Sequence, residues 1–524
     1  MEAIHWADQI VRRVIHDKGD KNSYTVAAGI TPSGVVHIGN FREIMTVDLI
    51  ARAFKHAKKR ARFIYSWDDY DVFRKVPKGM PKPDMLKKHL RKPIIDIPDP
   101  FETESSYARH HELDVEQDVA KVGIFPEYIY QAKKYRKGDY IKEIKIALKS
   151  TDKIKEILNE FRKEPLPKDW LPITGFCPEC GKDNLKFSNY DNKDTLKMDC
   201  KDCNTTININ LNKADFLKLP WRIDWPMRWA YEEVDFEPGG KDHSTTGGSF
   251  STAKEIVKLF KGTAPSYLMY NFISIKGAGG KISSSLGNVI TLRDCLEIYE
   301  PMIVRWLFAG TRPGSEFAIS FDLDVLKLYE DFDKCERIYY KKQEAKNDKE
   351  FAQQKRIYEL SAINKPLKKI SIQPSFRHLT NIVQIYNNDL KKIINYYNPQ
   401  SKEDKEKITT RANCAINWLK KYAPEDMKFK LQENPSKKII SQLKENEKQA
   451  LIKLSNSLKN KKFDEKSLFE EFYNISKSLE LESKEFFQVA YKILINKQKG
   501  PKLAPFILEI GKEKTIDILN TLKQ

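Results

Sequence analysis

Cysteines and long apolar runs are both scarce in this chain. Only 7 of its 524 residues are cysteine, and a small, odd number without a secretion signal argues against a disulfide framework. No apolar run is long enough to span a membrane. The N-terminal stretch MEAIHWADQIVRRVIHDKGD is charged and amphipathic, and it lacks the apolar segment of a signal peptide. We therefore expect a cytoplasmic protein that does not bind membranes.

The length and the charge distribution indicate several domains and suggest an anionic partner. A chain of 524 residues is too long for one ordinary hydrophobic core. The net charge is +19, and residues 331–524 carry +14 of it, with 40 basic and 26 acidic side chains. A basic third of this kind favours a polyanion, nucleic acid first. A lysine-rich, solvated helical surface explains the same charge equally well.

The N-terminal region has the pattern of a parallel α/β unit. Residues 23–30 form an apolar run that ends in a loop with glycine, and residues 41–60 repeat apolar side chains at helical spacing. Residues 61–71 then give a second apolar run that ends in acidic side chains. This order predicts a βαβ unit in a parallel sheet with helices on its faces. Ligands of such sheets bind at the carboxyl ends of the strands.

The rest of the chain divides by composition. We expect one charged helix over 139–164, a small cysteine-containing module over 171–212, and a return of α/β character over 219–321. Beyond residue 325 glycine is rare and apolar residues recur at helical spacing, which predicts an all-helical region. The stretch 420–438 is predicted to link two helical groups.

Two CxxC pairs predict a zinc site. CPEC and CKDC are separated by 19 residues, a spacing that can arrange four thiolates tetrahedrally around Zn²⁺. The predicted ligands are Cys177, Cys180, Cys200 and Cys203. Four protein ligands leave no open coordination position, so this zinc is expected to be structural.

The loop TPSGVVHIGN has the features of a phosphate site. Pro32 and Gly34 shape a tight turn, and His37, Gly39 and Asn40 follow at the start of a helix. The N–H groups and the dipole of a helix N-terminus attract anions, and His and Asn can hydrogen-bond to phosphate oxygens. The alternative is a tight turn that happens to contain a histidine.

A second loop, GAGGKISSSLGN, offers a cation and hydroxyl groups. Lys281, Ser283 and Ser284 lie in a glycine-rich stretch that suits a triphosphate moving between ground and transition states. The alternative is a solvent-exposed polar loop. The order of the elements adds weight, because the histidine loop follows the first strand and the lysine loop ends the α/β region.

These two loops resemble the HIGH and KMSKS signatures of class I aminoacyl-tRNA synthetases. The resemblance is closest to the class I lysyl-tRNA synthetases, through AAGITPSGVVHIGNFREI, SWDDYDVFRKVP, LPWRIDWPMRWAYEEVDFEPGGKDHSTTGGSF and KISSSLGNVI. It covers residues 1–330 densely and the remainder by general character. It implies a Rossmann-type catalytic domain over 1–330 that includes a zinc ribbon over 171–212, followed by an all-α anticodon-binding domain over 331–524.

The resemblance also implies site residues. It maps lysine contacts to Gly29, Thr31, Trp221, His243 and Tyr270. It maps ATP contacts to Pro32, Gly34, His37, Gly39, Gly247, Gly248 and Lys281, and catalytic roles to His37, Asn40, Lys281, Ser283 and Ser284. A buried ammonium also needs a carboxylate, and the sequence offers Asp68, Asp69, Asp71 and Asp242. Of these we expect Asp69 to bind it.

Two departures from the family pattern affect these expectations. The family usually has a second lysine after the serines of the mobile loop, where this chain has Leu286, so Lys281 would need help, for example from Lys276. Some members also bind a second zinc through a stretch that reads DPFETESSYARH here. Asp99 and His110 remain, but Thr103 and Glu104 replace the other two ligands. We expect one zinc.

The resemblance therefore implies an ATP-dependent lysine–tRNA ligase that uses Mg²⁺ with ATP, acts on L-lysine and tRNA(Lys), and is a monomer. Three alternatives stay open. A glutamate-type synthetase would need a cation for the substrate side chain. A small-molecule nucleotidyltransferase would share the histidine loop without needing a basic helical third. A non-catalytic tRNA-binding paralogue would account for Leu286.

Overall fold

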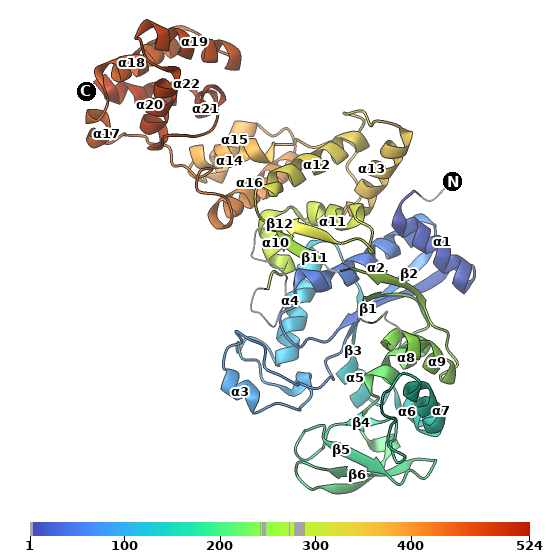
Figure 1. The fold of residues 1–524 in the computed structure, drawn as a ribbon. Coiled ribbons are helices and arrows are strands. Elements are labelled where there is room, and N and C mark those ends of the chain that lie inside the picture. The colour runs from blue at the N-terminus through green and yellow to red at the C-terminus, as the bar shows by residue number, and fades with distance from the viewer. Residues whose placement is uncertain (1–3, 242, 244–247, 272, 277–288, 524) are drawn as a thin grey trace.

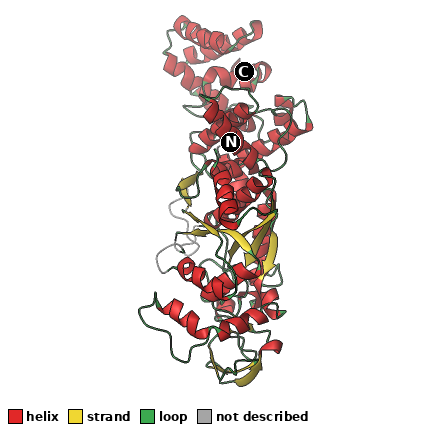
Figure 2. Cartoon of the chain, turned by 90° about the vertical axis from the view of Figure 1, so that its right-hand side faces the viewer, coloured by secondary structure: helices red, strands yellow, loops and turns green. Residues whose placement is uncertain are grey.

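The structure is a computed structural model that describes residues 4–241, 243, 248–271, 273–276 and 289–523. Figures 1 and 2 show an elongated chain with the parallel sheet in its middle, a small β module at one end and helices at the other. Within these described residues, no helix combines the length and the apolar composition that a membrane span requires.

The central sheet has five parallel strands. They are β1 (Ser23–Ile30), β2 (Arg60–Trp67), β3 (Glu127–Tyr130), β9 (Val234–Gly240) and β10 (Ser266–Tyr270). Their order is β10-β9-β1-β2-β3, and every neighbouring pair is parallel. The chain therefore adds β2 and β3 on one side of β1 and later adds β9 and β10 on the other side of β1. This confirms the predicted Rossmann-type sheet and places a topological switch point between β1 and β9, where such sheets bind ligands.

Helices cover both faces of this sheet. They include α1 (Trp6–Lys18), α2 (Ile38–His56), α4 (Tyr107–Lys121), α8 (Trp221–Tyr231) and α9 (Ser249–Leu259). The apolar stripe predicted for α2 is buried, since Ile44, Val47, Ile50 and Phe54 are all at most 2% exposed. Phe54 stacks on Tyr24 of β1 with ring centroids 4.7 Å apart. The packing of α2 on the sheet fixes its N-terminus at the end of β1.

The connections between these elements and the segment after β10 hold the remaining secondary structure of the α/β region. They contain α3 (Pro83–Lys87), η1 (Ile94–Asp96), α5 (Gln131–Arg136), α6 (Ile141–Lys149), α7 (Thr151–Asn159), β11 (Ile273–Lys276), α10 (Leu292–Ile298), α11 (Pro301–Gly310) and β12 (Phe317–Ser320). The single helix expected over 139–164 is wrong, because α6 and α7 are separate. Ser150 leaves helical geometry between them, with φ −96° and ψ 14°, and each helix buries its own apolar face.

The cysteine module is a small antiparallel structure. Its strands are β4 (Thr174–Gly175), β5 (Leu185–Ser188), β6 (Thr195–Cys200), β7 (Thr206–Asn210) and β8 (Leu217–Lys218), with η2 (Leu211–Lys213) between the last two. β5, β6 and β7 form one sheet, and β4 pairs with β8. The module is inserted between α7 and α8, so its two ends return to the catalytic region.

The C-terminal region is helical throughout its described residues, as predicted. Its first group is α12 (Asp324–Tyr339), α13 (Asp348–Ser361), α14 (Phe376–Ile385), α15 (Leu390–Tyr397) and α16 (Lys402–Lys421). Its second group is α17 (Lys437–Ser441), α18 (Glu445–Asn460), α19 (Glu465–Ser478), α20 (Ser483–Ile495), α21 (Leu503–Ile510), α22 (Lys512–Asn520) and η3 (Thr521–Lys523). The predicted linker lies between α16 and α17. Figure 1 places the second group at the far tip of the molecule.

The first helical group packs directly on the α/β region. Trp418 of α16 is buried and donates its indole N–H to the carbonyl of Phe321 at 2.9 Å. Arg411, also on α16, is fully buried and pairs with Glu300 of the α/β region and Asp333 of α12. α12 itself runs across residue 330, where the sequence suggested a domain boundary.

Candidate active site

A large cavity lies where the carboxyl ends of β1, β9 and β10 meet. Its volume is about 920 Å³, which lies within the range of small-molecule sites. Nine residues expected at the site line it: Gly29, Thr31, Gly34, His37, Gly39, Asn40, Trp221, His243 and Tyr270. The structure therefore brings together residues that are up to 241 positions apart in the sequence.

His37 lies at the N-terminus of α2, beside this cavity. Its backbone N–H donates to the side-chain oxygen of Asn40 at 3.3 Å, which ties the two predicted residues together. A Cβ at Gly39 would lie 2.8 Å from the imidazole, so glycine is needed there to admit the His37 ring. Burial lowers the pKa of His37, and its Nδ1 atom is buried without a partner among the described residues. A polar atom in this state is available to a ligand in the cavity.

Glu43 is a site residue that sequence reasoning missed. It lines the cavity one turn after Asn40 on α2. Its Oε1 accepts from the backbone N–H of Gly29 at 3.1 Å, and its Oε2 accepts from the hydroxyl of Tyr270 at 2.6 Å. Burial raises the pKa of Glu43 to about 7. No lysine, arginine or histidine among the described residues lies within ion-pair distance of it, so it can accept a cationic ligand.

Two other carboxylates that line the cavity, Asp68 and Asp71, already have cationic partners. Asp68 pairs with Arg228 at 2.7 Å, and Asp71 pairs with Lys218 at 2.6 Å. Burial raises the pKa of Asp68 to about 6. At Asp71 burial acts in the same direction, but the charge of Lys218 together with hydrogen bonds from Lys218 and Thr31 outweighs it, and the pKa falls. Glu316 also lines the cavity without an ion-pair partner among the described residues, but it is exposed to solvent. Glu43 is thus the buried carboxylate of this cavity whose charge is not balanced within the described part of the chain.

Asp69 does not lie at the cavity, and the expectation that it binds the ammonium needs correction. Its side chain is 2% exposed and accepts from the backbone N–H of Ala132 at 2.8 Å. Its neighbour Asp68 does line the cavity. Both residues follow the end of β2 at Trp67 and lie in the turn after it, where Asp68 faces the cavity and Asp69 faces the backbone of Ala132.

The remaining predicted residues divide into two sets. Pro32 is buried beneath the loop, and Gly248 precedes the first residue of α9, and neither lines the cavity. Gly247, Lys281, Ser283, Ser284, Asp242 and Leu286 lie outside the described residues. Lys276, suggested as a helper for Lys281, pairs with Asp324 and does not line the cavity.

Two further lysines at the cavity were missed. Lys75 and Lys78 line it and are exposed. They lie on the segment after the acidic end of β2, and Pro77 between them lies 3.3 Å from the position of a Cβ on Gly34. The sequence signal was the pair of lysines in RKVPK, directly after the motif that carries Asp68 and Asp71. They give the cavity positive charge on the side of the His37 loop.

Aromatic rings form one wall of the cavity. Trp221 of α8 stacks on Trp225 with centroids 5.4 Å apart and an interplanar angle of 13°. His243 lies 6.5 Å from the ring of Trp221. Trp225 and Trp229 are 6% and 2% exposed, so both belong to the core. Trp221 is the ring of this set that reaches the cavity.

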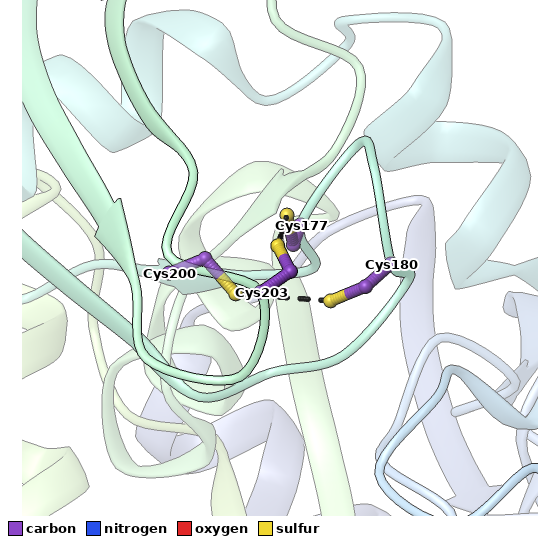
Figure 3. A group of neighbouring side chains, drawn as sticks. All are labelled: Cys177, Cys180, Cys200 and Cys203. Atoms are coloured by element: carbon purple, nitrogen blue, oxygen red, sulfur yellow. Dashed lines mark hydrogen bonds between the residues drawn. The ribbon is translucent and has the colours of Figure 1, made fainter.

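The four predicted zinc ligands converge (Figure 3). The sulfur atoms of Cys177 and Cys203 are 3.6 Å apart, those of Cys180 and Cys200 are 3.7 Å apart, and all four lie within 4.8 Å of one another. Zn–S bonds of about 2.3 Å in a tetrahedron separate the sulfurs by roughly 3.8 Å. The donor set and its spacing therefore fit a zinc ion with four thiolate ligands.

The stretch that resembles a second zinc site is held by internal hydrogen bonds. Asp99 Oδ2 accepts from the backbone N–H groups of Thr103 and Glu104 and from the hydroxyl of Thr103. The Thr103 hydroxyl also lies 3.0 Å from Nδ1 of His110. Thr103 thus links Asp99 and His110, the two residues of this stretch that match the family pattern.

The comparisons with family models and with known proteins all point to the same family. The family described as tRNA synthetases class I (K) matches residues 4–364, and an anticodon binding domain matches residues 392–521. Lysine–tRNA ligases from Borrelia garinii and Treponema pallidum are 50% and 44% identical, over 98% of this chain and 98% of each relative. The lysine–tRNA ligase of Thermococcus kodakarensis is 40% identical over 97% of this chain and 98% of its own length.

Among solved structures, a glutamate tRNA ligase from Elizabethkingia meningosepticum aligns with a TM-score of 0.46 and 14% identity, over 96% of this chain and 99% of that one. The family match covers the sheet, the cavity and the cysteine module, and the relatives match almost the whole chain. The chain belongs to the class I tRNA synthetase family.

Proposed function

We propose that this protein attaches L-lysine to tRNA(Lys) at the expense of ATP. The carboxylate of lysine attacks the α-phosphorus of ATP, the bond to pyrophosphate breaks, and lysyl-adenylate forms. A hydroxyl of the terminal tRNA ribose then attacks the lysyl carbonyl carbon, and AMP leaves. The observation that carries the choice of amino acid is Glu43, a carboxylate without a cationic partner among the described residues, in the same cavity as the His37 loop.

The pocket chemistry supports a cationic amino acid. The lysine ammonium is assigned to Glu43, whose two oxygens are held by Gly29 and Tyr270. The ring of Trp221 is suited to contact the aliphatic stem and can add a cation–π interaction of about 0.5–2 kcal/mol. Gly29, Thr31, His243 and Tyr270 keep the lysine-contact roles that the family resemblance implies, and all four line the cavity.

A glutamate-type specificity is less compatible with this cavity. A substrate carboxylate would need a free cation near Glu43, and the two cations that face the cavity carboxylates are already engaged. Arg228 pairs with Asp68, and Lys218 pairs with Asp71. Adding a second carboxylate beside Glu43 would place two like charges in a poorly solvated site, which is strongly unfavourable.

The phosphates of ATP are assigned to the His37 side of the cavity. There His37 offers a buried polar atom without a protein partner among the described residues, and Asn40 is held beside it. Lys281, Ser283 and Ser284 keep their predicted roles at the β- and γ-phosphates. Lys75 and Lys78 supply further positive charge and are better placed than Lys276 to compensate for Leu286. Mg²⁺ accompanies ATP in this proposal. Positioning and charge stabilisation then provide most of the catalysis.

The cysteine module is proposed to hold one structural Zn²⁺. Cys177, Cys180, Cys200 and Cys203 would fill its coordination sphere, so the metal would stabilise the module and take no part in the reaction. Binding of structural zinc is coupled to folding in such small modules. The module is inserted directly before α8, which carries Trp221, so its fold would help to fix one wall of the cavity.

The helical C-terminal region is proposed to bind tRNA. On α19, four side chains share one exposed helical face: Lys466, Phe469, Tyr473 and Lys477. Phe469 is 58% exposed and Tyr473 is 60% exposed. No acidic group of the described residues lies within ion-pair distance of either lysine. Unpaired RNA bases stack on exposed aromatic rings, and lysines neutralise the adjacent phosphates. We also infer a cytoplasmic monomer, and light scattering after gel filtration tests the oligomeric state.

The experiment that tests this function is ATP–pyrophosphate exchange with each of the twenty amino acids, with and without tRNA. Lysine-dependent exchange supports the proposal. Exchange that depends on glutamate instead identifies the competing synthetase. If none of the twenty amino acids supports exchange, the protein is a non-catalytic tRNA-binding protein. The arm with tRNA is needed because some class I synthetases related to this family require tRNA even for activation.

A further inference from the structure

Three tryptophans on α8 form a ladder that leads from the core to the cavity. Trp221, Trp225 and Trp229 are four residues apart and therefore lie on one face of the helix. Trp225 stacks on Trp221, and the centroids of Trp225 and Trp229 are 4.6 Å apart. Trp225 also lies 5.8 Å from the ring of His243. The position of Trp221 and His243 at the cavity thus depends on the two inner rings.

A buried carboxylate holds the inner rings. Glu237 of β9 is 9% exposed. Its Oε1 accepts from the indole N–H of Trp225 at 3.1 Å, and its Oε2 accepts from the indole N–H of Trp229. Among the described residues, no cation lies within ion-pair distance of Glu237. A carboxylate can accept from both indoles at once, whereas an amide has one acceptor oxygen and an NH2 group that would face the second donor. A buried carboxylate without a cation is nevertheless costly, and it places a negative charge close to the amino-acid pocket.

The same carboxylate lies behind the amino-acid pocket. A smaller inner cavity of about 80 Å³ is lined by both Glu43 and Glu237 and shares Trp221 and His243 with the large cavity. The charge of Glu237 contributes, after burial, to raising the pKa of Glu43. When both carboxyl groups are ionised they repel each other, and a cation bound at Glu43 relieves that repulsion.

We propose that Glu237 is a positioning and specificity residue for the amino acid. By holding the indoles of Trp225 and Trp229, it fixes Trp221 at the cavity wall. As a second negative charge behind Glu43, it favours substrates whose side chain is a cation over uncharged side chains of similar shape. The inference rests on the proposed lysine specificity. Glu237 itself does not touch the reacting atoms.

The test is Glu237→Gln, assayed by pyrophosphate exchange with lysine and with norleucine, which has an uncharged side chain of similar length. We expect KM for lysine to rise about tenfold, the change that one unit of pKa coupling corresponds to, while kcat changes by less than about threefold. The ratio of kcat/KM for lysine to that for norleucine should fall by a similar factor. The matched control is Glu232→Gln, because Glu232 at the end of α8 lines the same inner cavity and is equally buried, but its charge is neutralised by Arg62 and it does not contact the indoles.

The pH dependence of kcat/KM for lysine separates loss of the Glu237 charge from a change in the position of Trp221 at the cavity wall. Asp68, its partner Arg228 and His243 also line the inner cavity, and burial raises the pKa of Asp68 to about 6, so the pH limb is assigned to Glu43 by its loss in Glu43→Gln. Lysine binding needs ionised Glu43, so kcat/KM for lysine rises with pH through the pKa of that group. Removing the neighbouring charge lowers this pKa, and the rising limb should move to lower pH in Glu237→Gln. A purely structural change would leave the limb in place. Trp229→Phe keeps a ring but removes one donor to Glu237, which disfavours its charged form, so the limb should move in the same direction by less.

Trp229→Phe also keeps the proposal testable if Glu237→Gln does not fold, which thermal unfolding reveals. This inference alone is overturned if the wild-type protein shows lysine-dependent exchange while the folded variant keeps the wild-type KM for lysine, pH profile and lysine-to-norleucine ratio of kcat/KM. If the wild-type protein instead shows exchange that depends on a different amino acid, both the proposed function and this inference are overturned. The inference is supported if the rising limb of the pH profile moves to lower pH and the lysine-to-norleucine ratio of kcat/KM falls, and if neither change occurs in Glu232→Gln.

Discussion

Replacing Glu43 by glutamine removes the charge to which we assign the lysine ammonium while keeping the size of the side chain. The amide can still accept one of the two hydrogen bonds from Gly29 and Tyr270. Losing the charged partner of an enclosed ammonium costs about 2–3 kcal/mol when the site is partly open to water. At about 1.4 kcal/mol per decade this raises KM for lysine about 30- to 150-fold. Affinity for ATP should stay near the wild-type value.

The pH dependence gives this prediction a second, independent readout. Burial raises the pKa of Glu43 to about 7, so the free protein holds a neutral carboxyl below that pH and a carboxylate above it. Lysine remains cationic throughout this range and pairs with the carboxylate. Its KM should therefore fall as pH rises from about 6 to 8, and lysine should raise the melting temperature more at pH 8 than at pH 6. Glu43→Gln should lose both dependences.

The assay is ATP–pyrophosphate exchange at saturating ATP, with lysine titrated at several pH values. Glu255→Gln serves as the control for loss of a charge, because Glu255 on α9 is a surface carboxylate that pairs with Lys258. If Glu43→Gln keeps a lysine KM within about twofold of wild type and retains the pH-dependent limb, another group binds the ammonium and our reading of the pocket is wrong.

Three further predictions test the other parts of the proposal. Purified protein should contain one zinc per chain, and its removal should unfold roughly residues 171–212, since structural zinc contributes on the order of 10–16 kcal/mol; metal analysis that finds none or two contradicts this. His37→Ala and Lys281→Ala should each slow adenylate formation about 100-fold or more without weakening tRNA binding, and wild-type exchange rates would remove the residue from the mechanism. Phe469→Ala and Tyr473→Ala should each weaken tRNA binding by about 1–3 kcal/mol while lysine activation stays unchanged. A filter-binding titration at several salt concentrations measures the affinity. Full affinity for tRNA in both variants would exclude this face of α19 as a tRNA-binding surface.

The sequence was sufficient for those features that depend on neighbouring residues. The strand 23–30, the start of α2 after His37 and the two CxxC knuckles are each encoded within a short stretch, and the structure has them where they were predicted. The break at Ser150 was not predictable in the same way. The residues on both sides of it have helical periodicity, and α6 and α7 bury their apolar faces in the same core cluster, which a bend at Ser150 allows.

The division between catalytic and helical regions also depends on packing. Composition changes near residue 325, but α16 lies against the α/β region through Trp418 and the buried charge of Arg411. Removing everything after residue 325 would leave Glu300 without Arg411 and Phe321 without Trp418, so loss of activity in such a fragment would not report on tRNA. A truncation within the linker after α16 removes the second helical group and keeps these contacts.

The identity of the ammonium partner shows most clearly what a single sequence does not contain. Carboxylates at a strand end are natural candidates, and Asp68, Asp69 and Asp71 all follow β2. In the folded chain, however, one faces Ala132 and the other two are neutralised by Arg228 and Lys218, which come from positions about 150 residues later. Glu43 lies in the second turn of a helix, α2, that begins at Ile38, and only helical spacing from Asn40 hinted that it faces the cavity. Which carboxylate remains unbalanced is a property of the whole charge arrangement around the cavity, and that arrangement exists only after distant segments have packed together.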